Sequence, residues 1–351
     1  MQVRAPLLAV SGALVLGAVL LLLTGHDPIA AYAALVKGAL GGRGGANLMA
    51  TLQRATPIVG MGLATAVALR AGFLNLGGEG QLVLGALAAA LTVLELPLDG
   101  PILLPVGLLA GAVAGGLYAW LAYVLEARFT VPLLISTLLL NYPARYLASY
   151  AAAHPWRDVA SGMSQTALVP EAARLPALVS GSRLHAGSLL IVVLVLAAAW
   201  VLHRTRVGYE LRMTGLNADF ARYGGVDVRR LGARVMIVSG GLAGLVGAIE
   251  VLAVHHRFID GALTQPLYAW TGLMTALLAG SAPLGVLAAG LLFAGIQTGG
   301  FGMERGAGVP RELSRVIQAL AILLVAAASR LRLVTTVARD DSDGSDGDGD
   351  R

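Results

Sequence analysis

The sequence contains no cysteine, so neither a disulfide framework nor a thiolate metal site is possible. Its six histidines are scattered, and only His255 and His256 are adjacent. No HExxH spacing or similar metal-binding pattern is present. No pairing of a nucleophile with a base stands out either. We therefore expect a chain that is not an enzyme and that binds no metal or cofactor of its own.

Lysine is nearly absent as well. The chain has 24 arginines and a single lysine, Lys37, which lies in the context LVKGAL. A nucleotide-binding P-loop needs the pattern GxxxxGK[ST], because its lysine reaches the phosphates. This chain therefore cannot be an ATPase of that type. If its work is driven by ATP, the nucleotide and its Mg²⁺ belong to a partner subunit.

Charge is scarce, and long apolar runs replace it. Only 13% of the residues are charged, against about 25% in soluble domains, and the mean hydropathy is +0.76. Backbone in lipid must satisfy its own hydrogen bonds, so each apolar run should be helical. We predict an all-α, polytopic membrane protein with about ten transmembrane helices. The apolar stretches are 5–24, 56–74, 80–96, 102–124, 131–152, 187–203, 233–254, 267–280, 284–298 and 312–329.

The two ends of the chain have different characters. The first apolar run, 5–24, is about 20 residues long, which exceeds a signal-peptide core and suits an uncleaved span. The last twelve residues hold six aspartates and one arginine among glycines and serines. We predict a transmembrane domain over 1–339 and a disordered acidic tail over 340–351, solvated or docked to a partner.

The positions of the arginines predict which loops and termini lie on the cytoplasmic side of the membrane. Seven of them lie between residues 204 and 234, and such clusters mark cytoplasmic loops. Counting spans outward from this loop places both termini in the cytoplasm and the loop 153–186 outside. The loop 25–55 then also falls outside, although it carries more positive than negative charge, which is a mild conflict. The clustered arginines are Arg204, Arg206, Arg212, Arg222, Arg229, Arg230 and Arg234.

The stretch RAGFLNLGGEGQ (70–81) interrupts some forty apolar residues with polar side chains and glycines. One interpretation is a cytoplasmic turn between two helices, because glycine accepts positive φ. The other is a broken helix inside the protein, with Asn75, Glu79 and Gln81 facing a polar pathway. An ionised Glu79 at depth needs compensation, and Arg70 across a bend is one candidate partner.

A faint internal repeat accompanies this stretch. GLATAVAL (62–69) is similar to GLMTALLA (272–279), and each precedes a glycine-rich interruption and a second apolar run. Small residues produce such matches by chance, so a repeat and a coincidence both remain open. Interrupted spans in two halves of a chain are nevertheless a pointer to a transport site.

Several blocks, in order, resemble one family. RAGFLNLGGEGQLVLGALAAA resembles the hallmark of inner-membrane permeases of ABC importers, in the simple-sugar and nucleoside branch, where the pattern reads roughly GLFNIGAEGQ. Residues 205–252 are similar to the cytoplasmic loop and following span of that branch, and 276–300 to a late pair of spans with an NPLG element. STLLLNY (136–142) fits as well. The chain departs from the pattern at Gly78, where alanine is common, and at Ser281 and Ala282.

The resemblance implies a type II-like ABC importer permease and a set of partners. These are a second permease copy or paralogue, two cytoplasmic ABC ATPases that bind ATP and Mg²⁺, and an extracytoplasmic solute-binding protein. Membrane lipid surrounds the chain, and no nucleic-acid partner is expected. Nucleoside and monosaccharide permeases share these blocks, so the solute stays open between the two classes.

The cytoplasmic loop 204–232 contains GLNADFARYGG (215–225), which predicts a short surface helix with Asn217 or Asp219 near its start. The resemblance makes this the coupling helix that contacts the ATPase. A basic loop held at anionic headgroups is the alternative. The predicted ATPase-coupling residues are Gly215, Asn217, Ala218, Ala221, Arg222 and Tyr223.

Other polar residues lie in or near spans. Each could line a solute path or hydrogen-bond a neighbouring helix. Trp156 and Trp270 could stack on a sugar or base, or lie in an interfacial aromatic belt. The rival to an ABC permease is an ion-coupled secondary transporter that uses Glu79 with Arg70, or Glu250, as its coupling site. The predicted pathway or gate residues are Asn75, Glu79, Gln81, Asn141, Thr275 and Gln297.

Overall fold

The computed structural model describes residues 4–97 and 100–310, followed by 312–313, 315–317 and 319–320. Every regular element in these residues is a helix, and their only β-structure is two isolated bridges. The prediction of an all-α protein is therefore confirmed. The chain divides into two compact units, Leu48–Ala294 and a second unit that combines Met1–Asn47 with Gly295–Arg351.

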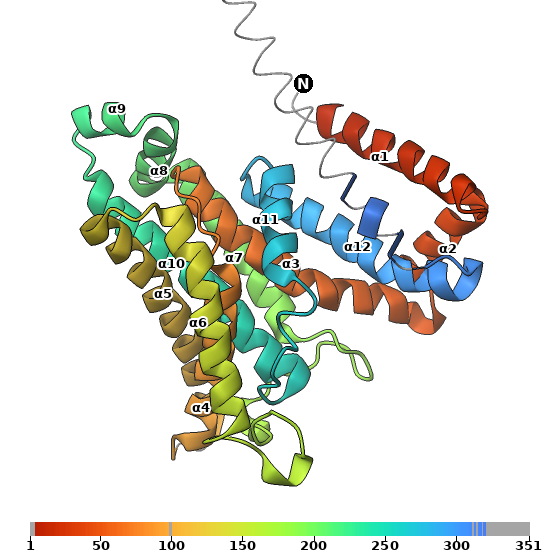
Figure 1. The fold of residues 1–351 in the computed structure, drawn as a ribbon, viewed down its shortest axis with the longest axis horizontal. Coiled ribbons are helices and arrows are strands. Elements are labelled where there is room, and N and C mark those ends of the chain that lie inside the picture. The colour runs from red at the N-terminus through yellow and green to blue at the C-terminus, as the bar shows by residue number, and fades with distance from the viewer. Residues whose placement is uncertain (1–3, 98–99, 311, 314, 318, 321–351) are drawn as a thin grey trace, which may run out of the picture. The chain divides into compact units, whose positions relative to one another are not determined.

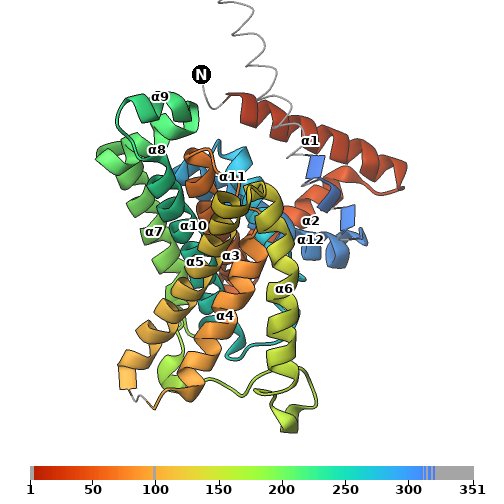
Figure 2. The same ribbon diagram turned by 60° about the vertical axis from the view of Figure 1, so that its left-hand side comes forward.

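The unit Leu48–Ala294 is a helical bundle (Figure 1). Its centre is formed by α4, α5 and α10, which pack closely on one another. Helices α6 and α7 lie on opposite sides of the bundle (Figure 2). Its long helices are α3 (Ala46–Arg70), α4 (Gly78–Glu95), α5 (Leu103–Phe129), α6 (Leu133–Ala153), α7 (Ala186–Arg204) and α10 (Val228–Glu250), which the π-helix η5 (Val251–His255) continues.

Shorter helices connect these elements. The helices α8 (Arg206–Leu216) and α9 (Ala218–Tyr223) lie between α7 and α10, and α11 (Tyr268–Leu278) precedes α12 (Pro283–Ala307). Three 3₁₀ turns occur in connections: η2 (Gly100–Ile102), η3 (Val159–Ser161) and η4 (Glu171–Ala173). The region 204–232, which the sequence analysis treats as one cytoplasmic loop, is therefore largely helical.

Glycines set the spacing of the central helices. Gly85 of α4 and Gly115 of α5 both lie against the backbone of α10 around Gly244, where an added Cβ would overlap main-chain atoms. Small residues at such positions let helix backbones approach closely, which is how membrane helices gain packing energy without a hydrophobic driving force between them. The closely packed centre of the bundle depends on these residues.

The two similar segments of the sequence lie against each other. A Cβ on Gly62 of α3 would meet Thr275 of α11 at 3.1 Å, and one on Gly272 would meet Gly62 at 2.8 Å. The aligned threonines also behave alike, since Thr65 and Thr275 each donate to the carbonyl four residues earlier. Threonine makes this bond in many helices, so the internal repeat stays a prediction.

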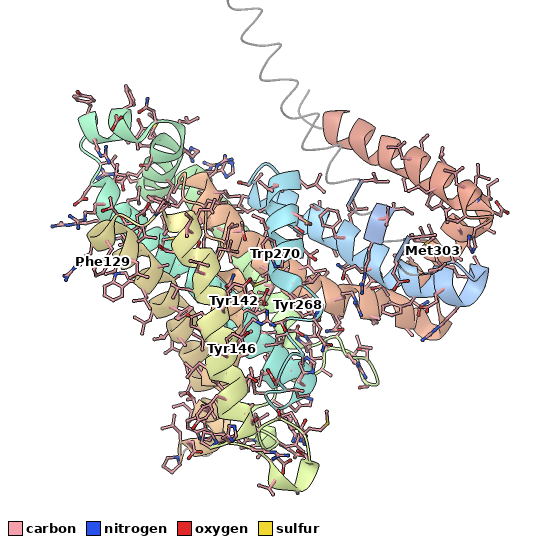
Figure 3. The ribbon with its side chains drawn as sticks, in the orientation of Figure 1. Phe129, Tyr142, Tyr146, Tyr268, Trp270 and Met303 are labelled. Carbon is pink, nitrogen blue, oxygen red and sulfur yellow. The ribbon has the colours of Figure 1, made fainter. Side chains whose placement is uncertain are left out.

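The second unit contains α1 (Arg4–Leu23), α2 (Pro28–Leu40), η1 (Arg43–Gly45) and the C-terminal part of α12. Asp27 caps α2 by accepting from the N–H of Ile29 at 2.9 Å. Leu21, Ala31, Met303 and Val309 form its apolar core; Figure 3 labels Met303.

Six of the described helices are long and apolar enough to cross a membrane: the spans fall in 46–70, 78–95, 100–129, 186–204, 228–255 and 283–307. Nine of the ten predicted apolar stretches coincide with described helices, although α11 has only 11 residues. The count of about ten is approximate, because most of 312–329 lies outside the described residues. The predicted acidic tail 340–351 lies outside them entirely.

Candidate functional site

The segment between α3 and α4 does not form a plain surface turn. After Arg70 the chain runs through non-helical residues 71–77, and Asn75 is buried. The Asn75 amide donates to Oε1 of Gln81 at 3.0 Å and to Oγ of Ser239 at 2.9 Å. Its carbonyl oxygen accepts from Nε2 of Gln81 and from the N–H of Gly77, both at 3.0 Å. These contacts hold the interrupting segment, called the broken helix below, inside the protein; its part in a solute pathway stays a prediction.

Helix α6 satisfies the backbone groups that the break leaves free. Asn141 accepts from the N–H of Gly80 at 2.8 Å and donates to the carbonyl of Leu76 at 2.9 Å. The hydroxyl of Thr137 accepts from the N–H of Leu76 at 3.2 Å. The first N–H groups of a helix need such partners, and Gly77, at the N-cap of α4, has no side chain to supply one.

Glu79 is paired with Arg145 of α6, at 3.5 Å between Nη1 and Oε1. The suggested pairing with Arg70 is wrong for this structure, because Arg70 closes α3 and its guanidinium reaches the carbonyl of Gly280 at 3.4 Å. Arg145 follows Asn141 by four residues, which brings both onto the side of α6 that meets the break. The Glu79 side chain is 12% exposed and that of Arg145 is 51% exposed.

Three tyrosines accompany Arg145 on the exposed side of α6. Tyr142, Tyr146 and Tyr150 recur every four residues, which places them on one face of the helix. They are 55%, 73% and 60% exposed, and Figure 3 labels Tyr142 and Tyr146. Sequence analysis missed this face, although the spacing in NYPARYLASY (141–150) would have indicated it.

A small pocket adjoins the break. Its volume is about 10 Å³, which is room for a single water molecule. Trp270 of α11 lines it and is 36% exposed. Trp156 lies elsewhere and donates to Glu95 at 3.0 Å. The residues that line the pocket are Thr65, Asn75, Leu76, Gly78, Glu79, Ala269, Trp270 and Leu273.

The structure therefore brings together Asn75, Glu79, Gln81 and Asn141 from the predicted set. It does not place Thr275 with them, because that buried hydroxyl donates to Thr271 within α11 and packs against Gly62. Gln297 lies on the part of α12 that belongs to the second unit. Glu250 is buried at the end of α10, and its carboxylate oxygens have no hydrogen-bond partner among the described residues.

The short surface helix predicted within 215–225 is present as α9, and Asn217 caps it; its coupling role stays a prediction. Its side-chain oxygen accepts from the N–H groups of Asp219 and Phe220 at 3.0 and 2.9 Å. Sequence analysis missed α8, which Thr205 caps by accepting from the N–H of Gly208 at 3.2 Å. Thr205 directly before an amphipathic run was the available signal.

The α8–α9 pair exposes apolar and charged side chains. Leu216, Phe220 and Tyr223 are 82%, 60% and 94% exposed, and exposed apolar patches mark contact with another protein or with a membrane surface. Arg222 is exposed beside Asp219, to which it is hydrogen-bonded at 2.6 Å. Within α9, Ala221 is buried and Ala218 is half-buried.

Gly215 joins this pair to the broken helix. A Cβ on Gly215 would overlap the carbonyl of Arg70, and one on Gly72 would lie 3.4 Å from the Cα of Gly215. The end of α8 therefore rests directly on the residues where α3 stops and the segment 71–77 begins. The contact between α8 and that segment is therefore between backbone atoms.

The fold and the site define a multi-pass membrane transport subunit, with a broken helix and a projecting pair of short helices. The chain belongs to the family described as the permease component of the branched-chain amino acid transport system, whose model matches residues 47–326. Membership supports a transport subunit over the ion-coupled carrier considered above.

Three relatives match nearly the whole chain. A guanosine ABC transporter permease protein of Bacillus subtilis is 33% identical, with 94% of each chain covered. A glucose ABC transporter permease protein of Haloferax volcanii is 36% identical over 91% of this chain and 86% of the relative. A nucleoside ABC transporter permease protein of Lactococcus lactis subsp. cremoris is 29% identical over 93% and 91%. No solved structure matches the chain.

Proposed function

We propose that this permease carries a nucleoside or simple sugar into the cell along the exposed face of α6, as one subunit of an ABC importer. The observation that carries the proposal is Arg145, a charged and half-exposed side chain in the middle of α6. It is paired with Glu79 and flanked by the three exposed tyrosines.

Helix α6 is not among the six helices that qualify as spans by length and hydropathy, but the sequence predicts a span over 131–152. An arginine at the centre of such a span is costly when it faces lipid. Insertion scales put the cost at about 2.5–3.5 kcal/mol, and such residues almost always face a protein interior or a water-filled cavity. The tyrosine hydroxyls likewise need polar partners. The α6 face is therefore suited to an aqueous path or to another subunit, and not to acyl chains.

The size of the pocket favours a path that more than one chain completes. A site for a drug-sized solute has a volume on the order of 300–1,000 Å³, whereas the pocket beside Glu79 and Trp270 has about 10 Å³. A second permease copy or paralogue facing α6 would enclose the path. The broken segment would then form its wall or its gate.

The side chains at this face suit a hydroxylated, ring-bearing solute. Tyrosine and tryptophan rings offer flat surfaces for stacking, while Glu79, Arg145 and Asn75 offer donors and acceptors for hydroxyl groups. The names of the three relatives, for guanosine, glucose and nucleosides, support the same solute class. Branched-chain amino acids, which the family description names, offer no ring to stack.

The exposed patch on α8 and α9 is the proposed contact with the ATPase. The sequence has no P-loop, so ATP and Mg²⁺ would be bound by two partner subunits and this chain would bind no cofactor. The arginine-rich 204–234 region favours a cytoplasmic position for this end of the unit and for both termini. An extracytoplasmic binding protein would deliver the solute to the opposite end.

The test uses uptake by the complete importer, with its own binding protein and ATPases. Radiolabelled nucleosides, monosaccharides and branched-chain amino acids are offered one at a time. We expect uptake of one of the first two classes and none of the third. Uptake of branched-chain amino acids alone, or uptake driven by an ion gradient without ATP, would contradict the proposal.

The role of the ion pair is tested by exchanging its charges. Glu79→Arg and Arg145→Glu each leave two like charges in contact, and we expect each to reduce uptake at least tenfold. The double exchange restores the pair and should recover part of the uptake. Arg157→Glu, at the far end of the unit and outside this face, serves as the control. If both single exchanges transport at the normal rate, the α6 face is not the path.

A further inference from the structure

A second exposed region of the bundle is an aliphatic groove, whereas the α6 face is polar and aromatic. A groove of about 300 Å³ opens between α3, α7, α8 and α10. Its walls are aliphatic and include Leu63, Leu194, Leu211 and Val238. Of the residues that line it, two carry a charge, Glu210 of α8 and Arg234 of α10.

The groove lies beside a helix face that suits lipid. Leu189, Val193, Leu196 and Trp200 form an exposed stripe along α7, and all four are apolar. In a membrane-crossing helix, an exposed apolar stripe of this kind contacts the acyl chains of the lipid. Residues of α7 line the groove, and α7 lies on the opposite side of the bundle from α6 (Figure 2).

The groove is elongated along the helices. On α10 its lining extends from Leu231 to Leu242, and Arg234 and Leu242 are about 12 Å apart along the helix axis. The charged end lies at α8, where α7 also ends with Arg204 and α8 begins with Arg206. Even with Glu210 present, this end has a surplus of positive charge.

We propose that this groove binds one acyl chain of an anionic phospholipid, whose headgroup phosphate is held by Arg234. Within the described part of the chain Arg234 has no ion-pair partner, whereas Arg230, one turn earlier, is paired with Asp227. The aliphatic groove suits the acyl chain of such a lipid, and the arginine at its end suits the negatively charged phosphate. This site is separate from the α6 path.

The cysteine-free sequence allows a direct test with single labels. Ala198→Cys places a bimane label in the groove, and Leu196→Cys places one on the neighbouring lipid-facing stripe as the control. The labelled permease, reconstituted in vesicles, is titrated with brominated phosphatidylglycerol or brominated phosphatidylcholine, which quench on contact. We expect the label at residue 198 to favour phosphatidylglycerol about fivefold, the ratio that one surface arginine supports. The control label should show no preference.

Arginine variants assign the preference to the groove. Arg234→Gln should remove it, Arg234→Lys should keep it, and Arg230→Gln should leave it unchanged because Arg230 does not line the groove. Glu210→Gln should increase it. Equal quenching by both lipids at residue 198, or a preference that survives Arg234→Gln, would overturn the proposal. So would a label at residue 198 that no lipid reaches, because a protein segment would then fill the groove.

Discussion

Single side chains hold the broken helix in place. Asn75 forms four hydrogen bonds with Gln81, Ser239 and Gly77, and all three partners are buried. An alanine at this position would leave the Gln81 amide and the N–H of Gly77 without these partners, while Ser239 would keep its bond to the carbonyl of Ala64. Each buried group without a partner costs about 1–3 kcal/mol. The segment 71–77 should therefore lose its fixed conformation before the bundle unfolds.

We predict that Asn75→Ala lowers solute uptake at least fivefold while the protein remains inserted. Uptake in vesicles and the amount of permease in the membrane fraction are measured together. Asn47→Ala, in the second unit, is the matched control and should transport normally. Normal uptake by Asn75→Ala would show that the segment is a passive connection.

His185 makes the loop end of α7 sensitive to acid. Its ring is buried and its two nitrogens have no hydrogen-bond partner among the described residues. Burial, with a smaller contribution from nearby His256, lowers the pKa of His185 from 6.5 to about 4. The folded state therefore favours the neutral ring. Stability from this group is complete above pH 6.5 and is lost as the pH falls toward 4.

We predict that the thermal unfolding midpoint of the purified permease decreases when the pH is lowered from 7 to 5. His185 should account for up to about 2 kcal/mol of the lost free energy of unfolding. His185→Phe should remove that part of the pH dependence. His154→Phe, at an exposed position, should leave the pH dependence as it is. An unchanged pH profile in His185→Phe would contradict this assignment.

At the scale of elements, we predict that α8 and α9 act as a lever on the segment 71–77. The contact between Gly215 and the end of α3 leaves no room for a Cβ. We predict that Gly215→Ala separates ATP hydrolysis from transport: the ATPase should still assemble, while uptake per ATP hydrolysed falls severalfold. Gly224→Ala is the control, since its Cβ would meet Ala221 at an ordinary 3.4 Å. Equal coupling ratios in the two variants would exclude the lever.

We predict a separate role in assembly with the ATPase for the exposed side of α9. Phe220→Ser combined with Tyr223→Ser removes two large exposed side chains, and interface aromatics commonly contribute 2 kcal/mol or more each. We predict that co-purification of the ATPase falls by about tenfold or more. Tyr209→Ser on α8 is the control. Undiminished ATPase recovery would place the docking surface elsewhere.

At the scale of the whole molecule, arginine placement predicts that α8 and α9 face the cytoplasm and that the 153–186 loop faces outward. Ser161→Cys should therefore react with an impermeant thiol reagent added to intact cells, and Ala218→Cys should react only after the cells are opened. The native chain contains no cysteine to confuse the measurement. The opposite labelling pattern would reverse the orientation.

The sequence by itself determined the class of this protein. Scarce charge and long apolar runs place it in a membrane, because lipid excludes unpaired polar groups. The missing P-loop excludes ATP hydrolysis of that type by this chain, since that chemistry needs particular residues at fixed spacing. The α9 helix and its Asn217 cap were predictable too, because a cap bonds to residues two and three positions away.

Only the tertiary structure decided the partners of the interrupting stretch. Glu79 meets Arg145 and not Arg70, and Asn75 meets Ser239, because helices distant in sequence pack around the break. The sequence left a turn and a broken helix nearly balanced, since glycines suit both. Which side of α6 faces outward, and where Gly215 rests, also depend on neighbouring helices. Contacts between distant segments follow from how the whole bundle packs, and no local pattern encodes them.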